Sequence, residues 1–193
     1  MIRKDLPQAC AAQVASAGTP LFVRHAVEDD AEALLGLRQR LFDETPFMLW
    51  GPAEFHETAL HERQRIAQAT AQAGSCLLVA EVDGQLVGLI QALGRAAARE
   101  RHVATLVLGV QQSHWGQGIS THLLRALLAW ARSAGLRRLE LTVQQANERA
   151  RRVFMRAGFQ VEGTRRCALF VNDQYVDQQY LSILLTRGGP GWI

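Results

Sequence analysis

Residues 110–124 read VQQSHWGQGISTHLL, and this stretch decides how the rest of the chain is interpreted. An apolar run ends at Val110, and a strongly apolar segment opens at Ile119. Between them, Gly116 and Gly118 allow backbone angles that a side chain would forbid and let a ligand approach the main chain closely. The first amide groups of a following helix would point outward unpaired, at the positive end of its dipole. The segment therefore forms either a tight strand-to-helix turn or a binding site for a pyrophosphate.

Two common nucleotide-binding patterns do not fit this turn. Thr121 stands where the dinucleotide fingerprint GxGxxG has its third glycine, and no strand-end acidic residue follows at the distance needed for a ribose. The phosphate-binding pattern GxxxxGK[ST] is also absent from the sequence. A classical dinucleotide or P-loop site is therefore not expected.

The segments around the turn predict one mixed α/β domain. Asp83-Gly84 joins two apolar runs, 75–82 and 85–92, a strong signal for a β-hairpin. Residues 43–52 break the periodicity and are expected to form a loop. Further strands are predicted at residues 21–24, 102–110, 138–143, 163–171 and 175–185, and helices after residue 30 and at 53–72, 119–134 and 148–157. This order predicts a twisted mixed sheet with helices packed on it.

Composition excludes several classes of protein. The 193 residues are 48% hydrophobic and 20% charged, which is ordinary for a soluble domain with a real core. A net charge of +3 without a run of like charges gives no sign of a nucleic-acid surface. Cys10, Cys76 and Cys167 show neither metal-ligand spacing nor a disulfide framework, so we expect no metal site and free thiols in the cytoplasm. No apolar run approaches the ~18 residues of a membrane helix.

The ends of the chain are expected to lie outside the folded domain. Residues 1–20 are rich in alanine and lack the continuous apolar stretch of a secretory signal. We expect them to form a poorly ordered or loosely docked extension. The domain itself is predicted to span residues 21–186, followed by a short tail at 187–193.

A second motif lies downstream of the glycine turn. Asn147, Ala150 and Phe154 precede Gly158-Phe159 and Gly163 in the spacing N-x-x-A-x-x-x-F-x-x-x-G-F-x-x-x-G. Together with the turn before it, this motif resembles the GNAT superfamily, the Gcn5-related N-acetyltransferases, over nearly the whole chain. The nearest resemblance is to small bacterial L-amino-acid or ribosomal-protein-type acetyltransferases.

The resemblance implies the GNAT fold, acetyl-CoA as cofactor and transfer of its acetyl group to a primary amine. The strand before the glycine turn would offer main-chain groups to the pantetheine arm and the thioester, and one of its amides would stabilise the oxyanion. The implied cofactor-binding residues are Leu108, Gly109, Val110, Trp115, Gly116, Gln117, Gly118, Ile119, Ser120, Asn147, Phe154 and Arg156. Asn147 fits a plain helix N-cap equally well. Arg149 and Arg152 could also reach the phosphates, although each fits a solvated helix face.

Two positions depart from the family pattern. Ser113 stands where many members have Arg or Gln, which would remove one contact and leave the backbone site. Phe154 stands where a Tyr commonly protonates the departing thiolate, and Phe cannot donate a proton. Water or another residue must therefore do so, or the thiolate leaves unassisted.

The acceptor amine needs a general base, because an amine with a pKa of about 10 is mostly ammonium at neutral pH. The candidates are His102, Glu100 and Glu44. His102 also fits an ordinary strand-edge histidine, and Glu44 a solvated loop carboxylate. Glu140 alternates with apolar neighbours and is expected to face away from them.

The acceptor site is predicted from an apolar loop. Phe47, Met48 and Trp50 form either core packing or a pocket wall that favours an apolar group beside the amine, and Tyr175 is a further substrate-binding candidate. No Cys or Ser lies in a recognisable nucleophile motif, so direct transfer within a ternary complex is expected. The alternatives are a non-catalytic acyl-CoA sensor and a partner-binding protein that kept only the fold. The resemblance also suggests a homodimer.

Overall fold

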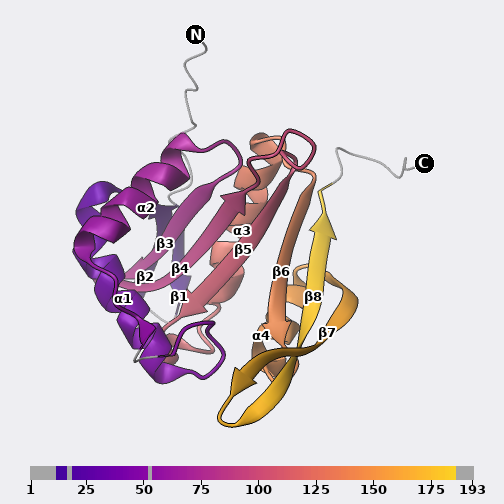
Figure 1. The fold of residues 1–193 in the computed structure, drawn as a ribbon. Coiled ribbons are helices and arrows are strands. Elements are labelled where there is room, and N and C mark those ends of the chain that lie inside the picture. The colour runs from indigo at the N-terminus through magenta and orange to yellow at the C-terminus, as the bar shows by residue number, and fades with distance from the viewer. Residues whose placement is uncertain (1–11, 17–18, 52–53, 186–193) are drawn as a thin grey trace.

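The computed structural model describes residues 12–16, 19–51 and 54–185, which form one eight-stranded sheet with helices on both faces (Figure 1). The strands are β1 (Ala12–Ser16), β2 (Thr19–His25), β3 (Cys76–Val82), β4 (Gln85–Gly94), β5 (Val103–Val110), β6 (Arg138–Gln144), β7 (Gln160–Val171) and β8 (Gln174–Leu184). The helices are α1 (Ala31–Glu44), α2 (Ala59–Ala71), α3 (Ile119–Ser133) and α4 (Glu148–Arg156), with short 3-10 turns η1 (Glu28–Asp30) and η3 (Gln112–His114). None of the helices that the structure describes is both long and apolar enough to cross a membrane.

The helices divide into two layers that follow from the alternation of side chains along the strands. Figure 1 shows α1 and α2 on one face of the sheet and α3 and α4 on the other. Leu89 of β4 packs in a core cluster with Leu37 of α1, whereas its neighbour Ile90 packs with Leu127 of α3. Successive side chains of a strand point to opposite faces of the sheet. An apolar strand such as β4 therefore contributes side chains both to the core under α1 and to the core under α3.

Most of the elements predicted from sequence are confirmed, with one clear change in α2. The predicted helix at 53–72 begins only at Ala59, because the Thr58 hydroxyl accepts a hydrogen bond from the His61 amide and caps the helix. The hairpin of β3 and β4 turns at Asp83-Gly84 as predicted. Asn147 caps α4 through a 3.1 Å hydrogen bond from the Ala150 amide to its Oδ1.

The N-terminal prediction needs a correction for residues 12–16. The sequence predicts a poorly ordered or loosely docked extension here, but these residues form β1, antiparallel to β2 from Ala12↔Val23 to Ser16↔Thr19. Main-chain hydrogen bonds to an edge strand stabilise such a segment almost regardless of its side chains, so composition alone is a poor guide. Residues 1–11 and the tail at 187–193 lie outside the described residues.

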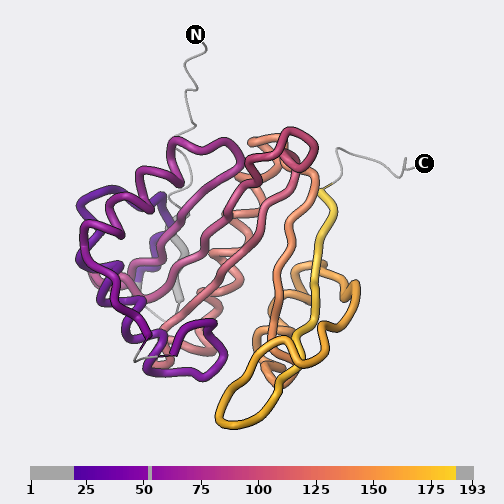
Figure 2. Tube along the Cα trace, viewed as in Figure 1, coloured from indigo at the N-terminus to yellow at the C-terminus, as the bar shows by residue number. Residues whose placement is uncertain are grey.

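The sheet is divided into two parts at β5 and β6. All neighbouring strands pair antiparallel except this pair, which is parallel and spans only residues 103–105 and 138–140. β5 remains paired with β4 as far as Val110, and β6 remains paired with β8 as far as Gln144. Beyond the short parallel contact the two strands diverge, which the trace in Figure 2 shows along their length.

An ionic network on the α1–α2 face joins the strands beside this short contact. Arg138 of β6 donates to Glu140 at 2.8 Å and to Glu162 of β7 at 2.7 Å, while Arg95 donates to Glu140 at 2.9 Å. The Ser182 hydroxyl of β8 donates to Glu162 at 2.6 Å. The prediction that Glu140 faces away from its apolar neighbours is confirmed. The network therefore connects β6, β7 and β8 with Arg95, which directly follows β4.

The network should make stability depend on pH in the acidic range. Hydrogen bonds from Arg138 and Ser182 lower the pKa of Glu162 from 4.5 to about 2. A lowered pKa contributes stability above pH 4.5 that is lost as the pH falls toward 2. Because the Glu162 side chain is 43% exposed, Glu162→Gln should cost only about 0.5–1 kcal/mol of unfolding free energy at pH 7, and this cost should shrink below pH 4.5.

Urea denaturation at pH 7, 4 and 3 would measure the effect. Glu148→Gln is the matched control, because its pair with Arg152 is on an exposed helix face. The control should show little cost at any of these pH values. An equal cost of Glu162→Gln at all three would contradict the assignment.

Candidate active site

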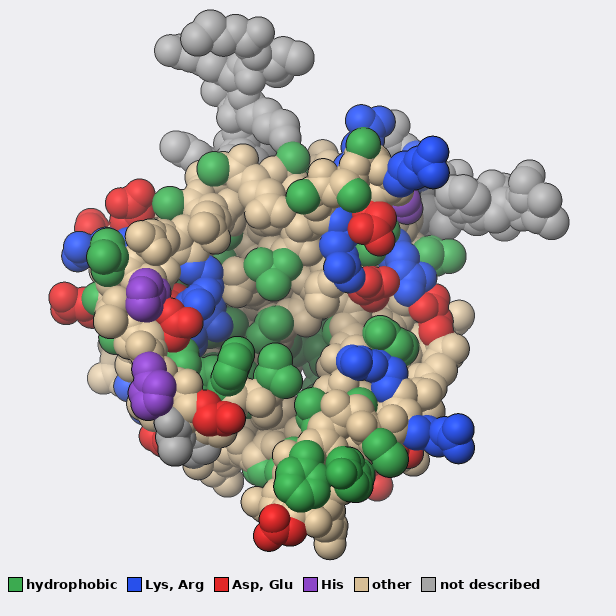
Figure 3. Space-filling view, in the orientation of Figure 1, with side chains coloured by type: hydrophobic (Ala, Val, Ile, Leu, Met, Phe, Trp, Pro, Cys, Tyr) green, Lys and Arg blue, Asp and Glu red, His purple; other side chains and the backbone are tan. Residues whose placement is uncertain are grey.

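A cleft of about 1370 Å³ lies where β5 and β6 diverge. Six consecutive residues of β5, 105–110, line it. Because successive side chains of a strand point to opposite faces, the cleft reaches both faces of the sheet through the opening between the strands. Its walls are the loop after α1 and the start of α2 on one face, and the glycine turn and α4 on the other. Figure 3 shows the hollow from the α1–α2 face, with hydrophobic side chains gathered in it.

The main chain of Leu108 faces the opening. The Arg95 amide donates to the Val103 carbonyl and the Gln111 amide donates to the Val87 carbonyl, so odd-numbered residues of β5 bond to β4. In an antiparallel pair, the residues between them turn their N–H and C=O groups to the other side. Leu108 lies beyond the last residue paired with β6. Its amide and carbonyl are therefore positioned to bond a ligand.

The glycine turn has the geometry that the sequence predicted. Gly116 and Gly118 have φ values of 82° and 79°, and Gly118 is the N-cap of α3. At Gly116 an added Cβ would meet nothing within 4 Å, and at Gly118 only the His122 ring at 4.0 Å, so neither glycine is required by packing. The amides of Ile119 and Ser120 begin the helix at the wall of the cleft. They present the positive end of the helix to the cavity.

Trp115 and Arg149 extend this wall. The Trp115 indole donates a 2.7 Å hydrogen bond to the Val110 carbonyl, which fixes the ring against the end of β5. The guanidinium of Arg149 lies 4.4 Å from the centroid of that ring, and both residues line the cleft with Arg156. Arg152 instead forms an exposed pair with Glu148, as expected for a solvated helix face. The cleft is therefore positively charged where the glycine turn meets α4.

Asn147 and Phe154 both line the cleft from α4, although each also has a structural role. Asn147 is the N-cap of the helix, and its contact with a pantetheine stays a prediction. Phe154 is 5% exposed, and its ring lies 5.4 Å from the ring of Phe159 in an edge-on arrangement. Gln117 does not line the cleft, and its side-chain amide donates to the Ser113 carbonyl at 3.5 Å.

The structure does not bring His102 and Glu100 to the cleft. Both are exposed in the loop before β5, at the end where β5 and β6 pair. The lining of the cleft begins only at Thr105 and continues toward the opposite end of the strand. The prediction that these residues lie near β5 is confirmed, but they lie at the N-terminal end of β5, whereas the cleft lies toward its C-terminal end.

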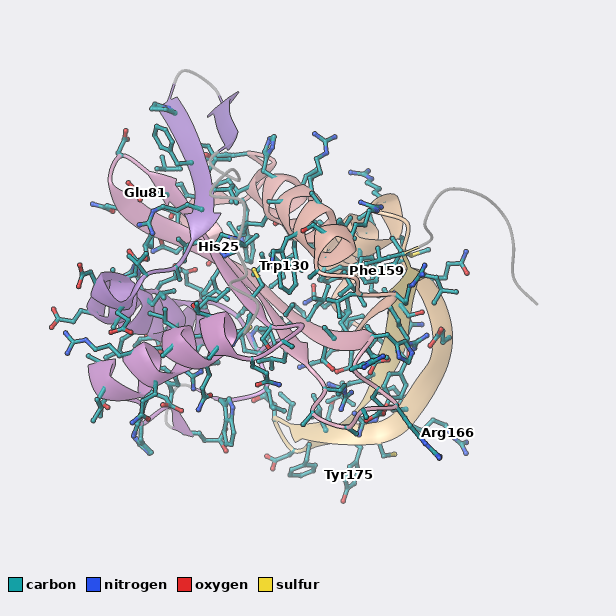
Figure 4. The ribbon with its side chains drawn as sticks, turned by 90° about the horizontal axis from the view of Figure 1, so that it is seen from above. His25, Glu81, Trp130, Phe159, Arg166 and Tyr175 are labelled. Carbon is teal, nitrogen blue, oxygen red and sulfur yellow. The ribbon has the colours of Figure 1, made fainter. Side chains whose placement is uncertain are left out.

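The side chains of Glu44 and Tyr175 also make their contacts outside the cleft. The Glu44 carboxylate accepts a 2.7 Å hydrogen bond from the Gln112 amide, which ties the end of α1 to the loop after β5. Tyr175 lies at the tip of the β7–β8 hairpin, is 73% exposed and packs its ring 5.1 Å from that of Phe170. Figure 4 shows Tyr175 pointing away from the body of the protein. Neither side chain lines the cleft.

The apolar loop after α1 does line the cleft. Phe47, Met48 and Trp50 form one wall with Phe42 and Phe55, whose rings are 4.6 Å apart. Trp50 is 53% exposed and Phe47 is 36% exposed, so these side chains are not buried core residues. This geometry favours the interpretation as a pocket wall.

Sequence reasoning missed the charged residues that α1 and α2 contribute to this face. Arg38 and Arg65 line the cleft and share Glu62, whose carboxylate lies 2.9 Å from the Arg38 Nε and is 0% exposed. Desolvation lowers the pKa of Arg38, while the charge of Glu62 opposes that change. Glu57 forms ion pairs with Arg65 at 3.2 Å and with His61 at 3.0 Å. In the sequence these residues are typical of an ordinary polar helix.

The known proteins that this chain resembles are acetyltransferases. The sequence model described as the acetyltransferase (GNAT) family matches residues 35–159. The chain is 28% identical over 167 residues to the L-amino acid N-acetyltransferase AaaT of Escherichia coli (strain K12), covering 84% of this chain and 96% of that protein. It is 39% identical over 69 residues to the ribosomal-protein-serine acetyltransferase of the same organism, covering 35% of this chain and 38% of that protein.

Two solved structures show how far the likeness extends. The acetyltransferase of the GNAT family from Streptococcus pneumoniae has a TM-score of 0.83 at 25% identity, covering 86% of this chain and 99% of the other. The protein yncA of Salmonella typhimurium, solved with its cofactor acetyl-CoA, has a TM-score of 0.78 at 18% identity, covering 89% and 97%. The architecture of this chain is therefore shared over nearly its whole described length.

Proposed function

The chain belongs to the GNAT acetyltransferase family and is an acetyl-CoA-dependent acetyltransferase, and from its cleft we propose that it transfers the acetyl group directly to a primary amine in a ternary complex. The fold expected from the resemblance is confirmed. The observation that carries the proposal is the opening between β5 and β6, which connects two differently lined halves of one cleft. A cleft of about 1370 Å³ exceeds the ~300–1,000 Å³ of a site for one small molecule.

The two halves suit the two substrates. The positive wall of the glycine turn and α4 suits the phosphates of acetyl-CoA, and the apolar and charged wall on the α1–α2 face suits the amine. The residues present therefore fit acetyl-CoA as the acetyl donor. The thioester and the amine would then meet at the opening beside Leu108, each entering from its own face of the sheet.

The amide of Leu108 is placed to stabilise the oxyanion. As the amine nitrogen bonds to the acetyl carbon, the carbonyl oxygen gains negative charge, and a main-chain N–H that faces the opening would bind it. The C–S bond then breaks and the thiolate of coenzyme A leaves. Phe154 cannot protonate that thiolate, so water or another residue would do so, or the thiolate leaves unassisted.

The acceptor must lose a proton before it attacks. With His102, Glu100 and Glu44 placed elsewhere, the titratable groups that line the acceptor half of the cleft are Glu54, His56, Glu57 and His61. The amine proton would reach one of them through water. In the pair of His61 and Glu57, the Glu57 carboxylate lies 3.0 Å from the ring Nδ1, which also accepts a 3.4 Å hydrogen bond from the Thr58 amide.

The relatives support an amino acid or a peptide N-terminus as the acceptor, because those relatives are named for L-amino acids and for a ribosomal protein.

The proposal also includes that the protein forms a homodimer in the cytoplasm. The exposed rings of Phe170 and Tyr175 offer an apolar patch that a second copy would cover, and light scattering would measure the mass.

Calorimetric titration with acetyl-CoA, followed by thiol release against a panel of amines, tests the proposed function. Binding with amine-dependent thiol release is expected. Binding without release for any amine would favour the alternative, a non-catalytic acyl-CoA sensor, for which Phe154 is the supporting observation. Absence of binding would refute the role of the glycine turn as a cofactor site.

A further inference from the structure

One arginine enters the acceptor half of the cleft from the side opposite the aromatic loop. Arg165 of β7 lines the cleft together with Gln178 of β8. Its Nη1 donates a 3.1 Å hydrogen bond to the Gln178 side-chain oxygen, and its guanidinium lies 5.5 Å from the centroid of the Tyr180 ring. These two contacts hold a long side chain in a defined place at the wall of the cleft.

Strand register places Arg165 on the same face as the apolar loop. Arg165 pairs with Gln178, and Gln178 pairs with Gln144 of β6, so the three side chains form a row across the sheet. Gln144 donates a 3.1 Å hydrogen bond to the carbonyl of Pro46, which belongs to the loop after α1. The row therefore begins at the edge of the opening between β5 and β6 and ends at Arg165.

The charge of Arg165 is not neutralised by a neighbouring carboxylate. Arg38 and Arg65, on the opposite wall, are already paired with Glu62. Among the described residues, no Asp or Glu side chain forms an ion pair with Arg165. It is thus a cation in the acceptor half that is available to bind an anion.

We propose that Arg165 binds the carboxylate of the acceptor, so that the preferred acceptors are small amino acids in which an apolar side chain accompanies the amine and the carboxylate. The planar guanidinium binds a carboxylate through parallel hydrogen bonds. Two strand spacings, about 10 Å, separate β7 from β6 at the opening, a distance that an Arg side chain and a small amino acid span together. The apolar side chain would then face Met48 and Trp50 across the cleft. This inference rests on the proposed function and narrows its acceptor.

The test compares acceptors that differ only in the carboxylate. Thiol release would be measured with L-methionine against 3-(methylthio)propylamine, and with L-phenylalanine against 2-phenylethylamine. The wild-type enzyme should prefer the amino acid in kcat/KM by about tenfold or more. Arg165→Met, which keeps the apolar stem, should lose about ten- to a hundredfold on the amino acids, mainly through KM, and change little on the amines.

Arg166→Met is the matched control. Arg166 is the neighbouring arginine, does not line the cleft and points away from the body of the protein in Figure 4. Its substitution removes the same charge from the same strand and should leave the preference unchanged. An equal loss on amino acids and amines in Arg165→Met, or a wild-type enzyme indifferent to the carboxylate, would overturn the inference while the acetyltransferase stands.

A binding measurement keeps this test independent of turnover. Calorimetric titration of L-methionine into the wild-type protein and Arg165→Met, each saturated with coenzyme A, should show the same ten- to hundredfold loss. If no amine is turned over but this difference is seen, the carboxylate site stands and the proposed function fails. Equal affinity in the two proteins would overturn the carboxylate site.

Discussion

Gly118→Val should lower the affinity for acetyl-CoA by about a hundredfold, the equivalent of ~2.7 kcal/mol. Gly118 has a φ of 79°, a region in which a β-branched residue is a strong outlier. To avoid this positive φ, the backbone at residue 118 must adopt other dihedral angles. The amides at the start of α3 would then no longer point into the cleft. The new side chain would also occupy the mouth of the site, because Gly118 lines it. Calorimetric titration measures the loss.

Gly84→Val separates this effect from backbone strain. Gly84 lies in the β3–β4 hairpin with a φ of 73° and has nothing within 4 Å of an added Cβ, but it does not line the cleft. Both variants should lose a similar unfolding free energy, about 1–2 kcal/mol from the left-handed backbone. Gly84→Val should bind acetyl-CoA as the wild type does. If Gly118→Val also does, the turn is structural and the cofactor lies elsewhere.

Glu62→Ala should cost about 3–5 kcal/mol of unfolding free energy. Glu62 is 0% exposed, and the Arg38 side chain beside it is 8% exposed, with their charged groups 2.9 Å apart. Removing the carboxylate leaves a guanidinium that has lost its water and its partner. Its remaining hydrogen bond, to the Gln91 side chain at 3.3 Å, does not neutralise the charge. Urea denaturation at pH 7 would measure the change.

The double variant Arg38→Met/Glu62→Leu tests whether the cost comes from the unpaired charge. Replacing both charges with apolar groups of similar size should restore most of the stability, because a buried ion pair is often no better than a packed apolar pair. A double variant as unstable as Glu62→Ala would instead mean that the shape of this cluster is what matters. A loss below about 1 kcal/mol in Glu62→Ala would show that water reaches the pair.

Sequence could predict those parts of the fold and the site that depend on local chemistry. Asp83-Gly84 sets a hairpin, Asn147 caps a helix, and Gly118 supplies a left-handed residue at a helix start. Each is decided within a few residues, so the pattern in the chain is enough. The glycine turn at the wall of the cleft was predictable for the same reason.

The acceptor side could not be predicted in this way, because long-range pairing decides it. The sequence shows that His102 is close to a strand. The contact of that strand with residues 138–140, much later in the sequence, determines which of its ends borders the opening. Arg165 becomes part of the cleft only because β7 and β8 fold back beside β6. Burial of Arg38 with Glu62 likewise depends on the packing of two helices. No local pattern carries that information.

The short contact between β5 and β6 also bears on how the chain is assembled during synthesis. Strands β1 to β5 are complete by residue 110 and, apart from the short contact of β5 with β6, they pair with one another in the order in which they are made. Strands β6 to β8 form a second contiguous group after residue 138. Each group can therefore form its own hydrogen bonds as it leaves the ribosome, before the other is needed. The opening between β5 and β6 then lies at the junction where the later-made strands dock onto the earlier ones.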